Sequence, residues 1–546
     1  MLLKKIFSRY SIFVFFICLI ILSLLYGYHK SIRYKPTSIH QWRQADCWSF
    51  TVNYYEENLN FFKPSLHYIG SSDTGNASGE FPIVYYFVSK LWKIFGQKAW
   101  VFRGVNLLIV FLGLAALFKL VEDVLQDTAW ALMLTLLIFT SPIMVYYSNN
   151  FITDTPAFGF SLTGGWYFYK FYQKQKSINL WLACLFFLLG ALLKITAAML
   201  FISILIVFIV EQTGLIKFRN GTKLFQKPGK QIIPFLVVIV LTFAWYTYSA
   251  IYNRQYNGEY FLLGIWPIWR MDYPLINEVT RILNENLVYQ FFSTPVLFMV
   301  IGMLALLLIF REKTSPLMLS LTLLLTTGGV LYLFLFYRVF DVHDYYLLNL
   351  LIIVVAVLLT FFFYIKQNHP ALLKSVRLKL FFLVFLCLNI YYARVKNQIK
   401  YDRRIEKWEY SFLNRSNELE YWRWWHWYHE TYLIAYESIT PYLRSLSIER
   451  TDRVISINDP SPNITLALMD QKGVSDFGKS ITDADRMYDE IKRGAQYLIV
   501  NKEEYYQQEY MQVFIQKKMG SYLNVDIYDL RNLRDSIVNS NRLSSY

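Results

Sequence analysis

The sequence predicts an all-α membrane domain with about eleven transmembrane helices, followed by a small α/β domain. Hydrophobic residues make up 55% of the 546 residues and only 17% are charged, against roughly 25% charged in an average globular protein. The apolar residues gather in runs long enough to cross a bilayer, which takes ~20 helical residues. After residue 395 these runs stop, and strand-like and helix-like segments alternate, as is typical of an α/β domain.

Eleven apolar runs are candidates for membrane-spanning helices, and together they form a membrane domain over residues 1–395. The runs lie at 11–28, 99–120, 128–147, 155–172, 178–193, 196–212, 232–250, 293–310, 315–336, 345–365 and 378–394. The first run follows a basic N-terminus, as in a signal peptide. Because it is long and no small-residue cleavage site follows it, we interpret it as an uncleaved helix.

The basic residues of the loops predict which side of the membrane each loop faces, because Lys and Arg concentrate in cytoplasmic loops. If the N-terminus, with Lys4, Lys5 and Arg9, is cytoplasmic, the basic loops after the fourth, sixth, eighth and tenth runs are cytoplasmic too; the acidic loop 121–127 is the exception. With eleven crossings, the C-terminus lies outside. We therefore expect a multi-pass protein of the cell (inner) membrane with an extracytoplasmic C-terminal domain.

Three long segments then lie outside the membrane: 29–98, 251–292 and the tail after residue 395. In the first, the amphipathic stretch "FPIVYYFVSKLWKIFG" predicts a helix lying in the membrane interface. The tail begins with a linker, 396–449, whose stretch "YWRWWHWYHETY" is typical of the headgroup level. In the α/β domain, 450–546, "RTDRVISIND" and "AQYLIVN" indicate strands, and "SPNITLALMDQKG" and "DADRMYDEIKRG" indicate helices. No Gly-rich phosphate loop follows its first strand, so we assign it no cofactor.

The net charge of +15 is explained by cytoplasmic loop charges and by attraction to lipid phosphates, and the sequence has no basic patch of a nucleic-acid-binding fold. Three of the four cysteines fall inside apolar runs and only Cys47 lies in a predicted loop, so a disulfide framework is not expected. No Cys/His spacing typical of a metal site occurs. We expect membrane lipid, and not nucleic acid, as a partner.

Ionisable side chains near the outer membrane boundary are the candidate functional residues, because charge at membrane depth is costly and tends to be functional. Asp46 lies in "HQWRQADCW", directly after the first span. Trp42 and Trp48 are expected to hold this stretch at the interface, where an aspartate has less water around it, a raised pKa and the properties of a general base. A solvated loop carboxylate is the alternative. Arg43 is a candidate to orient Asp46 or to meet a phosphate.

Four further groups are candidates for contacts with an acceptor or a metal. Glu80 precedes the amphipathic helix and is either an acid or metal ligand facing Asp46, or an acid that satisfies the helix dipole. Asp154, in "SNNFITDTPAFGF", is a second functional acid, a cap of the fourth span, or both. His343 and Asp344 lie at the mouth of the tenth span. A His beside acids can bind metal or relay a proton, although a lone His is more often structural.

Two cations are candidates for phosphate binding. Lys194 lies between two short apolar runs with no carboxylate near it in sequence, and it either extends to the outer surface or contacts a phosphate. Arg254 follows the seventh span; its planar fork suits a phosphate, although an ordinary loop arginine is the alternative. All these groups fall on the same side of the predicted membrane map. Acids for proton transfer and cations for phosphate fit a phosphate-carrying donor held in lipid.

These stretches resemble a known family, the membrane glycosyltransferases with the GT-C fold. The resemblance covers roughly residues 35–360 and is carried by "WRQADCWSFTVNYYEENLNFF", "GEFPIVYYFVSKLWKIFG", "FRGVNLL", "FITDTPAFGFSL" and "HDYYLLNLL". The chain is similar to bacterial members of the group that contains the dolichyl-phosphate-mannose protein mannosyltransferases and the lipid A aminoarabinose transferase. The resemblance implies transfer of a sugar from a polyprenyl-phosphate donor on the outer face of the membrane.

The resemblance also implies roles for individual residues. Asp46 matches the first-loop acid that acts as base on the acceptor hydroxyl, and Asp154 matches the second acid of the family pattern. Lys194 and Arg254 occupy places where relatives contact the donor phosphate.

A metal cofactor is left open by the resemblance. Glu80 aligns with an acid at the start of the interfacial helix, where some relatives bind a divalent cation, so Glu80 is its candidate ligand. Cys47 stands where relatives often carry a second acid after the first, which departs from the family pattern.

We therefore expect an enzyme that moves a sugar to an envelope glycan, lipid or protein, with the second outer segment and the tail shaping the acceptor site. Three alternatives stay open. A transporter or flippase for a lipid-linked sugar would need polar residues at mid-membrane and often shows paired halves. A GT-C-like glycan polymerase or ligase would use a lipid pyrophosphate donor. A non-enzymatic envelope protein would explain the tail but not the acids of the first outer segment.

Overall fold

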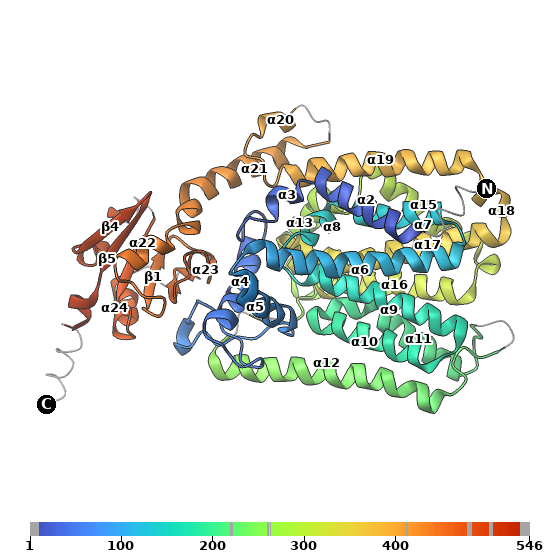
Figure 1. The fold of residues 1–546 in the computed structure, drawn as a ribbon, viewed down its shortest axis with the longest axis horizontal. Coiled ribbons are helices and arrows are strands. Elements are labelled where there is room, and N and C mark those ends of the chain that lie inside the picture. The colour runs from blue at the N-terminus through green and yellow to red at the C-terminus, as the bar shows by residue number, and fades with distance from the viewer. Residues whose placement is uncertain are drawn as a thin grey trace.

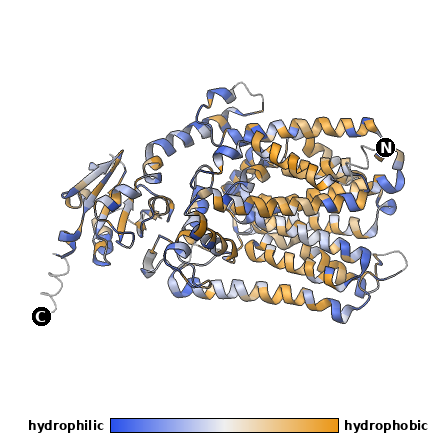
Figure 2. Ribbon diagram, in the orientation of Figure 1, coloured by the Kyte–Doolittle hydropathy of each residue, from blue (hydrophilic) through white to orange (hydrophobic). Residues whose placement is uncertain are grey.

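The predicted membrane spans all fold as helices. The computed structural model describes residues 10–218, 222–258, 261, 264–409, 413–477, 483–501 and 506–535. The spans correspond to α2 (Ser11–Leu25), α6 (Ala99–Leu125), α7 and α8 (Thr128–Phe139, Pro142–Ser148), α9 (Asp154–Lys174), α10 (Ser177–Leu193), η2 and α11 (Ile195–Ala198, Met199–Gln212), α12 (Pro228–Tyr256), α15 (Thr294–Ile309), α16 (Pro316–Leu335), η7 and α17 (Asp344–Leu350, Leu351–Asn368) and α19 (Val376–Gln398). They lie side by side along the long axis of the molecule (Figure 1) and carry most of its hydrophobic residues (Figure 2).

Length and apolarity make this chain a multi-pass membrane protein. In the part of the chain that the structure describes, six helices are long and apolar enough to cross a membrane, and two bent helix pairs raise the number to eight. α2 and α10 are apolar but shorter. The fold class is therefore confirmed as a helical membrane domain, while the count of eleven crossings stays a prediction.

The third predicted span, 128–147, is broken in two. α7 and α8 meet at an angle of 76°, and Pro142 stands in the first turn of α8. Proline has no N–H to donate, so it ends one helix and suits the first turn of the next.

A buried arginine lies near this break. Arg103 of α6 donates to the backbone carbonyls of Tyr34 and Asn149. This side chain thereby joins the first outer segment to the turn between α8 and α9.

The first outer segment contains two main helices at one end of the bundle, α4 (Gln41–Glu56) and α5 (Ile83–Phe95). α5 is amphipathic, as predicted: Tyr85, Val88 and Trp92 are buried, whereas Phe87 and Ile94 are exposed. The exposed apolar face is compatible with a membrane interface, and its position at the interface stays a prediction.

The two tryptophans of "HQWRQADCW" do not both act as interface anchors, so that expectation is wrong for Trp48. Trp48 is buried and packs edge-on against Trp92 and Phe151, in the core between α4, α5 and α6. Trp42 is partly exposed and packs against Phe477 of the C-terminal domain. The stretch forms the first turns of α4 rather than a loop, and its burial comes from protein contacts.

The remaining helices connect these parts. The structure has α3 (Tyr28–Ser31), α13 (Tyr273–Ile282), η4 (Leu283–Leu287), α14 (Val288–Phe291), α18 (Pro370–Lys374), α20 (Glu406–Glu409), α21 (Ser416–Tyr428) and α22 (Thr440–Ser445). α21 holds most of the aromatic linker, and its Tyr421, Trp424 and Trp427 are exposed.

The C-terminal domain is an α/β unit, as predicted. Its five strands are β1 (Val454–Ile457), β2 (Gly473–Ser475), β3 (Tyr497–Val500), β4 (Lys518–Tyr522) and β5 (Val525–Asp529). They form one sheet in the order β2-β1-β3-β5-β4, in which β1 pairs in parallel with β2 and β3, and β5 pairs antiparallel with β3 and β4. The two predicted helices are α23 (Ile464–Met469) and α24 (Ala484–Lys492).

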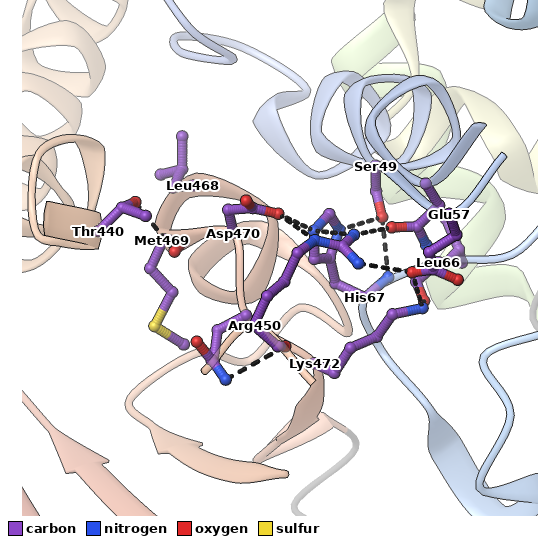
Figure 3. A network of polar contacts seen from close by, with 12 residues as sticks. Ser49, Glu57, Leu66, His67, Thr440, Arg450, Leu468, Met469, Asp470 and Lys472 are labelled. Carbon is purple, nitrogen blue, oxygen red and sulfur yellow. Dashed lines mark hydrogen bonds and ion pairs between the residues drawn. The ribbon is translucent and has the colours of Figure 1, made fainter. Parts of the chain in front are cut away.

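This domain is docked on the first outer segment, which the sequence did not predict. The amide of Ile69 donates to the carbonyl of Gly473 at 2.9 Å, and the amide of Gly473 donates to the carbonyl of His67 at 3.1 Å, so the outer segment extends the β2 edge of the sheet. Beside this edge, Arg450 forms ion pairs with Asp470 and Glu57, as Figure 3 shows.

The docking contacts include a buried histidine and a partly exposed ion pair. His67 pairs with Asp470 at 2.9 Å, and Lys472 pairs with Glu57 at 2.9 Å. Burial lowers the pKa of His67 to about 4, so this imidazole is neutral at pH 7. Since the contacts join two segments about 400 residues apart, they fix the C-terminal domain against α4.

Candidate active site

Asp46 lies in a buried polar site where α4 meets the C-terminal domain. Its side chain is 2% exposed. Asn463 of the C-terminal domain donates to Oδ1 at 3.4 Å, and Nη1 of Arg43 lies 3.9 Å from Oδ2. Burial raises the pKa of Asp46 to about 7, against the opposing effects of Arg43 and Asn463. A carboxylate that gains and loses its proton near neutral pH suits a general base.

Glu80 is held firmly by its neighbours. Arg43 reaches both of its carboxylate oxygens, and the hydroxyl of Tyr85 donates to one of them. Thr153 also donates to Oε1, at 3.3 Å. Although burial alone would raise the pKa of Glu80, Arg43 and Tyr85 hold it below its usual value. Glu80 is therefore an anion that positions Arg43 between two acids.

Cys47 stands beside this arrangement and adds no second carboxylate. Its sulfur contacts the hydroxyl of Tyr85 at 3.3 Å, and burial raises the pKa of the thiol to about 12. The thiol is thus neutral at pH 7. Tyr85 links Cys47 to Glu80.

Lys194 and Asp154 form an ion pair, although 40 residues separate them in sequence. Nζ of Lys194 lies 3.0 Å from Oδ1 of Asp154, and their side chains are 18% and 3% exposed. The ammonium also lies 4.0 Å from the ring centroid of Tyr346. Asp154 does not cap α9: Thr153 stands at the cap position and Asp154 lies in the first turn. Lys194 is turned toward the protein and is not extended to the outer surface.

His343 and Asp344 do not act as a pair. Asp344 lies 3.0 Å from Nε2 of His40 and accepts from the hydroxyl of Tyr147. Nδ1 of His343 instead contacts the backbone carbonyl of Val339 at 3.2 Å, and its ring stacks on His40 with centroids 5.6 Å apart. Burial lowers the pKa of His343 to about 4. His40, and not His343, is the partner of Asp344, so a role of His343 in proton relay or metal binding stays a prediction.

The structure brings most of the predicted residues together. Thr153, next to Asp154, bonds to Glu80; Glu80 binds Arg43 beside Asp46, and Asp154 pairs with Lys194. Arg254 is not brought to this site. It is exposed in the last turn of α12, and within the described residues it makes no ion pair.

The site does not match a metal centre. The described ranges of the chain contain no group of three or more His, Cys, Asp or Glu side chains that could hold an ion. Both oxygens of Glu80, the candidate ligand, are engaged by Arg43. We therefore derive no step through a metal.

Four site residues were not predicted from the sequence as members of the site. Tyr85, Thr153 and Asn463 are uncharged side chains in apolar or turn-like stretches, and His40 begins the stretch "HQWRQADCW" without a predicted role. The only local signal was proximity: Thr153 adjoins Asp154, and Tyr85 lies five residues after Glu80. Nothing near Asn463 in sequence points to Asp46, because the contact depends on domain docking.

One protein-family model matches part of the chain. Residues 79–248 match the family model "Dolichyl-phosphate-mannose-protein mannosyltransferase", a segment that includes Glu80, Asp154 and Lys194. No curated protein sequence matches the chain.

Two solved structures share the fold. ArnT from Cupriavidus metallidurans in the apo state has a TM-score of 0.57 at 10% identity, over 96% of this chain and 98% of that chain. ArnT bound to undecaprenyl phosphate has a TM-score of 0.56 at 9% identity, over 94% of this chain and 97% of that chain. The chain therefore shares the GT-C fold of these ArnT structures, and its residues 79–248 are similar to the mannosyltransferase family.

Proposed function

We propose that this enzyme transfers a sugar from a polyprenyl-phosphate donor to a hydroxyl group of an envelope glycan, lipid or protein. The observation that carries the proposal is the buried Asp46, with a pKa of about 7, beside Arg43. A base near a fixed cation suits a reaction in which a hydroxyl loses a proton while a phosphate leaves. The similar ArnT structure is bound to undecaprenyl phosphate, which supports a donor of this chemical class.

Arg43 and Lys194 are the proposed contacts of the donor phosphate. Nη1 of Arg43 is buried and makes no hydrogen bond within the described residues. Lys194 has three N–H groups, and only the contact with Asp154 engages a carboxylate. Both cations therefore keep donor capacity for phosphate oxygens. Arg254 is not part of this proposal, because it lies exposed in the last turn of α12.

The reaction follows from these positions. The acceptor hydroxyl gives its proton to Asp46 as its oxygen bonds to the anomeric carbon of the sugar. The bond between that carbon and the phosphate oxygen breaks, and its electron pair leaves with the polyprenyl phosphate. Arg43 and Lys194 stabilise the negative charge that develops on the phosphate. The polyprenyl chain stays in the lipid around the apolar helices.

The rate of transfer is expected to rise with pH through about 7. Asp46 must be ionised to accept a proton, so below this pH the rate should fall by about tenfold per pH unit. The charged and polar groups that act on Asp46 are Arg43, Glu80, Asp459 and Asn463. The fall in rate on the acid side of the pH profile, the acid limb, reports their combined effect. The measurement is kcat in detergent between pH 5.5 and 8.5. A flat profile across this range would contradict the assignment of the base.

A cavity beside the site is the proposed entry for the acceptor. It has a volume of about 660 Å³ and lies between the second outer segment, α19 and α21. Asp344, the partner of His40, lines it, and aromatic walls come from Tyr391, Tyr392, Tyr421 and Trp422. Aromatic rings with polar groups between them suit an amphipathic or sugar-containing acceptor.

Tyr421→Ala is expected to raise the KM for the acceptor by about fivefold with little change in kcat, because an aromatic contact is worth about 1 kcal/mol. The KM for the donor should not change. The matched control is Trp424→Ala, which removes an exposed ring from the same helix that does not line the cavity. Equal effects of the two substitutions would argue against this entry route.

The arrangement in the membrane is also proposed. We infer a membrane domain over 1–395, a linker over 396–449 and a docked domain over 450–546. The site lies at the end of the bundle next to the C-terminal domain (Figure 1). With a cytoplasmic N-terminus, the site and the C-terminal domain face the outside of the inner membrane, where envelope acceptors are available.

A further inference from the structure

We propose that the C-terminal domain completes the active site, with Asn463 as a positioning residue that holds Asp46 toward the acceptor hydroxyl. This inference rests on the proposed function. Asn463 is fully buried. Its Nδ2 lies 3.4 Å from Oδ1 of Asp46 and 3.5 Å from the carbonyl of Ala45. These distances are long for hydrogen bonds, as is common in catalytic sites before substrate binds.

A backbone contact fixes the orientation of the Asn463 amide. Its Oδ1 accepts from the backbone amide of Tyr68 at 3.3 Å. Because that amide can only donate, the oxygen of the side chain must face Tyr68 and the NH₂ group must face Asp46. Asn463 of the C-terminal domain thus bridges two parts of the first outer segment, Tyr68 and the proposed catalytic base Asp46.

The turn that carries Asn463 is itself tightly bonded. Asp459 accepts from the backbone amides of Ser461 at 3.0 Å and Thr465 at 2.7 Å, and the Thr465 hydroxyl also donates to it at 2.7 Å. The hydroxyl of Ser461 in turn accepts from the amide of Ile464 at 2.9 Å. The stretch "NDPSPNIT" therefore forms a rigid support.

The two oxygens of Asp46 consequently have different surroundings. Oδ1 is held by Asn463, whereas Oδ2 faces Nη1 of Arg43 at 3.9 Å. Oδ2 is the oxygen placed to accept the proton, next to the cation proposed to hold the leaving phosphate. The donor from Asn463 also stabilises the ionised carboxylate, so the C-terminal domain adjusts the pH range in which the base works.

The test compares pH profiles of sugar transfer for two variants of the full-length protein. Asn463→Asp keeps an oxygen that can accept from Tyr68 but places a second carboxylate beside Asp46. Its acid limb is expected to move up by about one pH unit or more, since like charges oppose ionisation. Asn463→Ala removes both the donor to Asp46 and the acceptor for the Tyr68 amide, and should move the limb up by about half a unit and lower kcat by about tenfold.

The matched control is Asp470→Asn, which disturbs the docking contacts with His67 and Arg450 away from Asp46. If this control moves the acid limb as far as Asn463→Ala does, the role of Asn463 is only structural and the inference fails. It also fails if both Asn463 variants keep the wild-type limb while Asp46→Asn is inactive. If Asp46→Asn is itself fully active, Asp46 is not the base and the proposed mechanism fails. This outcome distinguishes a failure of the proposed mechanism from a failure of the inference about Asn463.

Discussion

Asp46→Asn is expected to lower kcat for sugar transfer by at least about 100-fold, because a positioned general base contributes about 10²–10⁴-fold. Asparagine has nearly the same shape as aspartate but cannot accept the proton. The carboxylate is buried beside Arg43 and Asn463, so neither bulk water nor a neighbouring loop acid is placed to replace it. The KM for the donor should change little, because the proposed phosphate contacts remain.

The control for this substitution is Asp489→Asn, an exposed carboxylate on α24 that pairs only with Lys492 at 3.6 Å among the described residues. It should leave kcat unchanged. Thermal unfolding of both variants in detergent checks that they fold. A folded Asp46→Asn protein that transfers sugar at the wild-type rate would show that another group takes the proton.

Lys194→Gln is expected to lower kcat/KM for the donor by about 100- to 1,000-fold, since a cation at a developing negative charge contributes several kcal/mol to the transition state. The substitution also leaves Asp154, 3% exposed, without its partner. Breaking a buried pair in this way costs up to about 3–5 kcal/mol of stability. Activity alone therefore does not separate a role in phosphate binding from a role in folding.

The double variant Lys194→Gln/Asp154→Asn separates the two roles. Because it removes both charges, it should recover most of the stability lost in the single variant. If Lys194 binds the donor phosphate, the double variant stays inactive although its thermal unfolding returns toward wild type. Recovery of both stability and activity would mean that the ion pair only supports the turn between α10 and η2.

The candidate site residues were predictable because charge is rare at a membrane boundary. Asp46, Glu80, Asp154 and Lys194 stood out in an apolar sequence, and the loop charges placed them on one side. Their pairing was not predictable. Lys194 meets Asp154 across two helices, and a contact between helices depends on packing that a hydropathy pattern does not contain. Arg254 lies at the same predicted boundary but is exposed in the last turn of α12 and makes no ion pair among the described residues.

The local environment of each residue was the least predictable part. A tryptophan near a membrane can be an anchor or a core residue, and Trp48 is a core residue because α5 and α6 cover it. His343 adjoins Asp344 in sequence, yet that acid pairs with His40 of the first outer segment. The helices and strands followed from periodicity, whereas the docking of the C-terminal domain rests on contacts between residues such as Glu57 and Arg450.

The most direct test of the central claim is to identify the lipid product. The purified protein would be incubated with a polyprenyl-phosphate-linked sugar and an envelope acceptor fraction, and the lipid extract analysed by mass spectrometry. We expect free polyprenyl phosphate to appear together with glycosylated acceptor, and Asp46→Asn to release neither. Release of polyprenyl pyrophosphate from a pyrophosphate donor would contradict it in favour of a polymerase or ligase, and passage of the intact donor across vesicles without bond cleavage would contradict it in favour of a flippase.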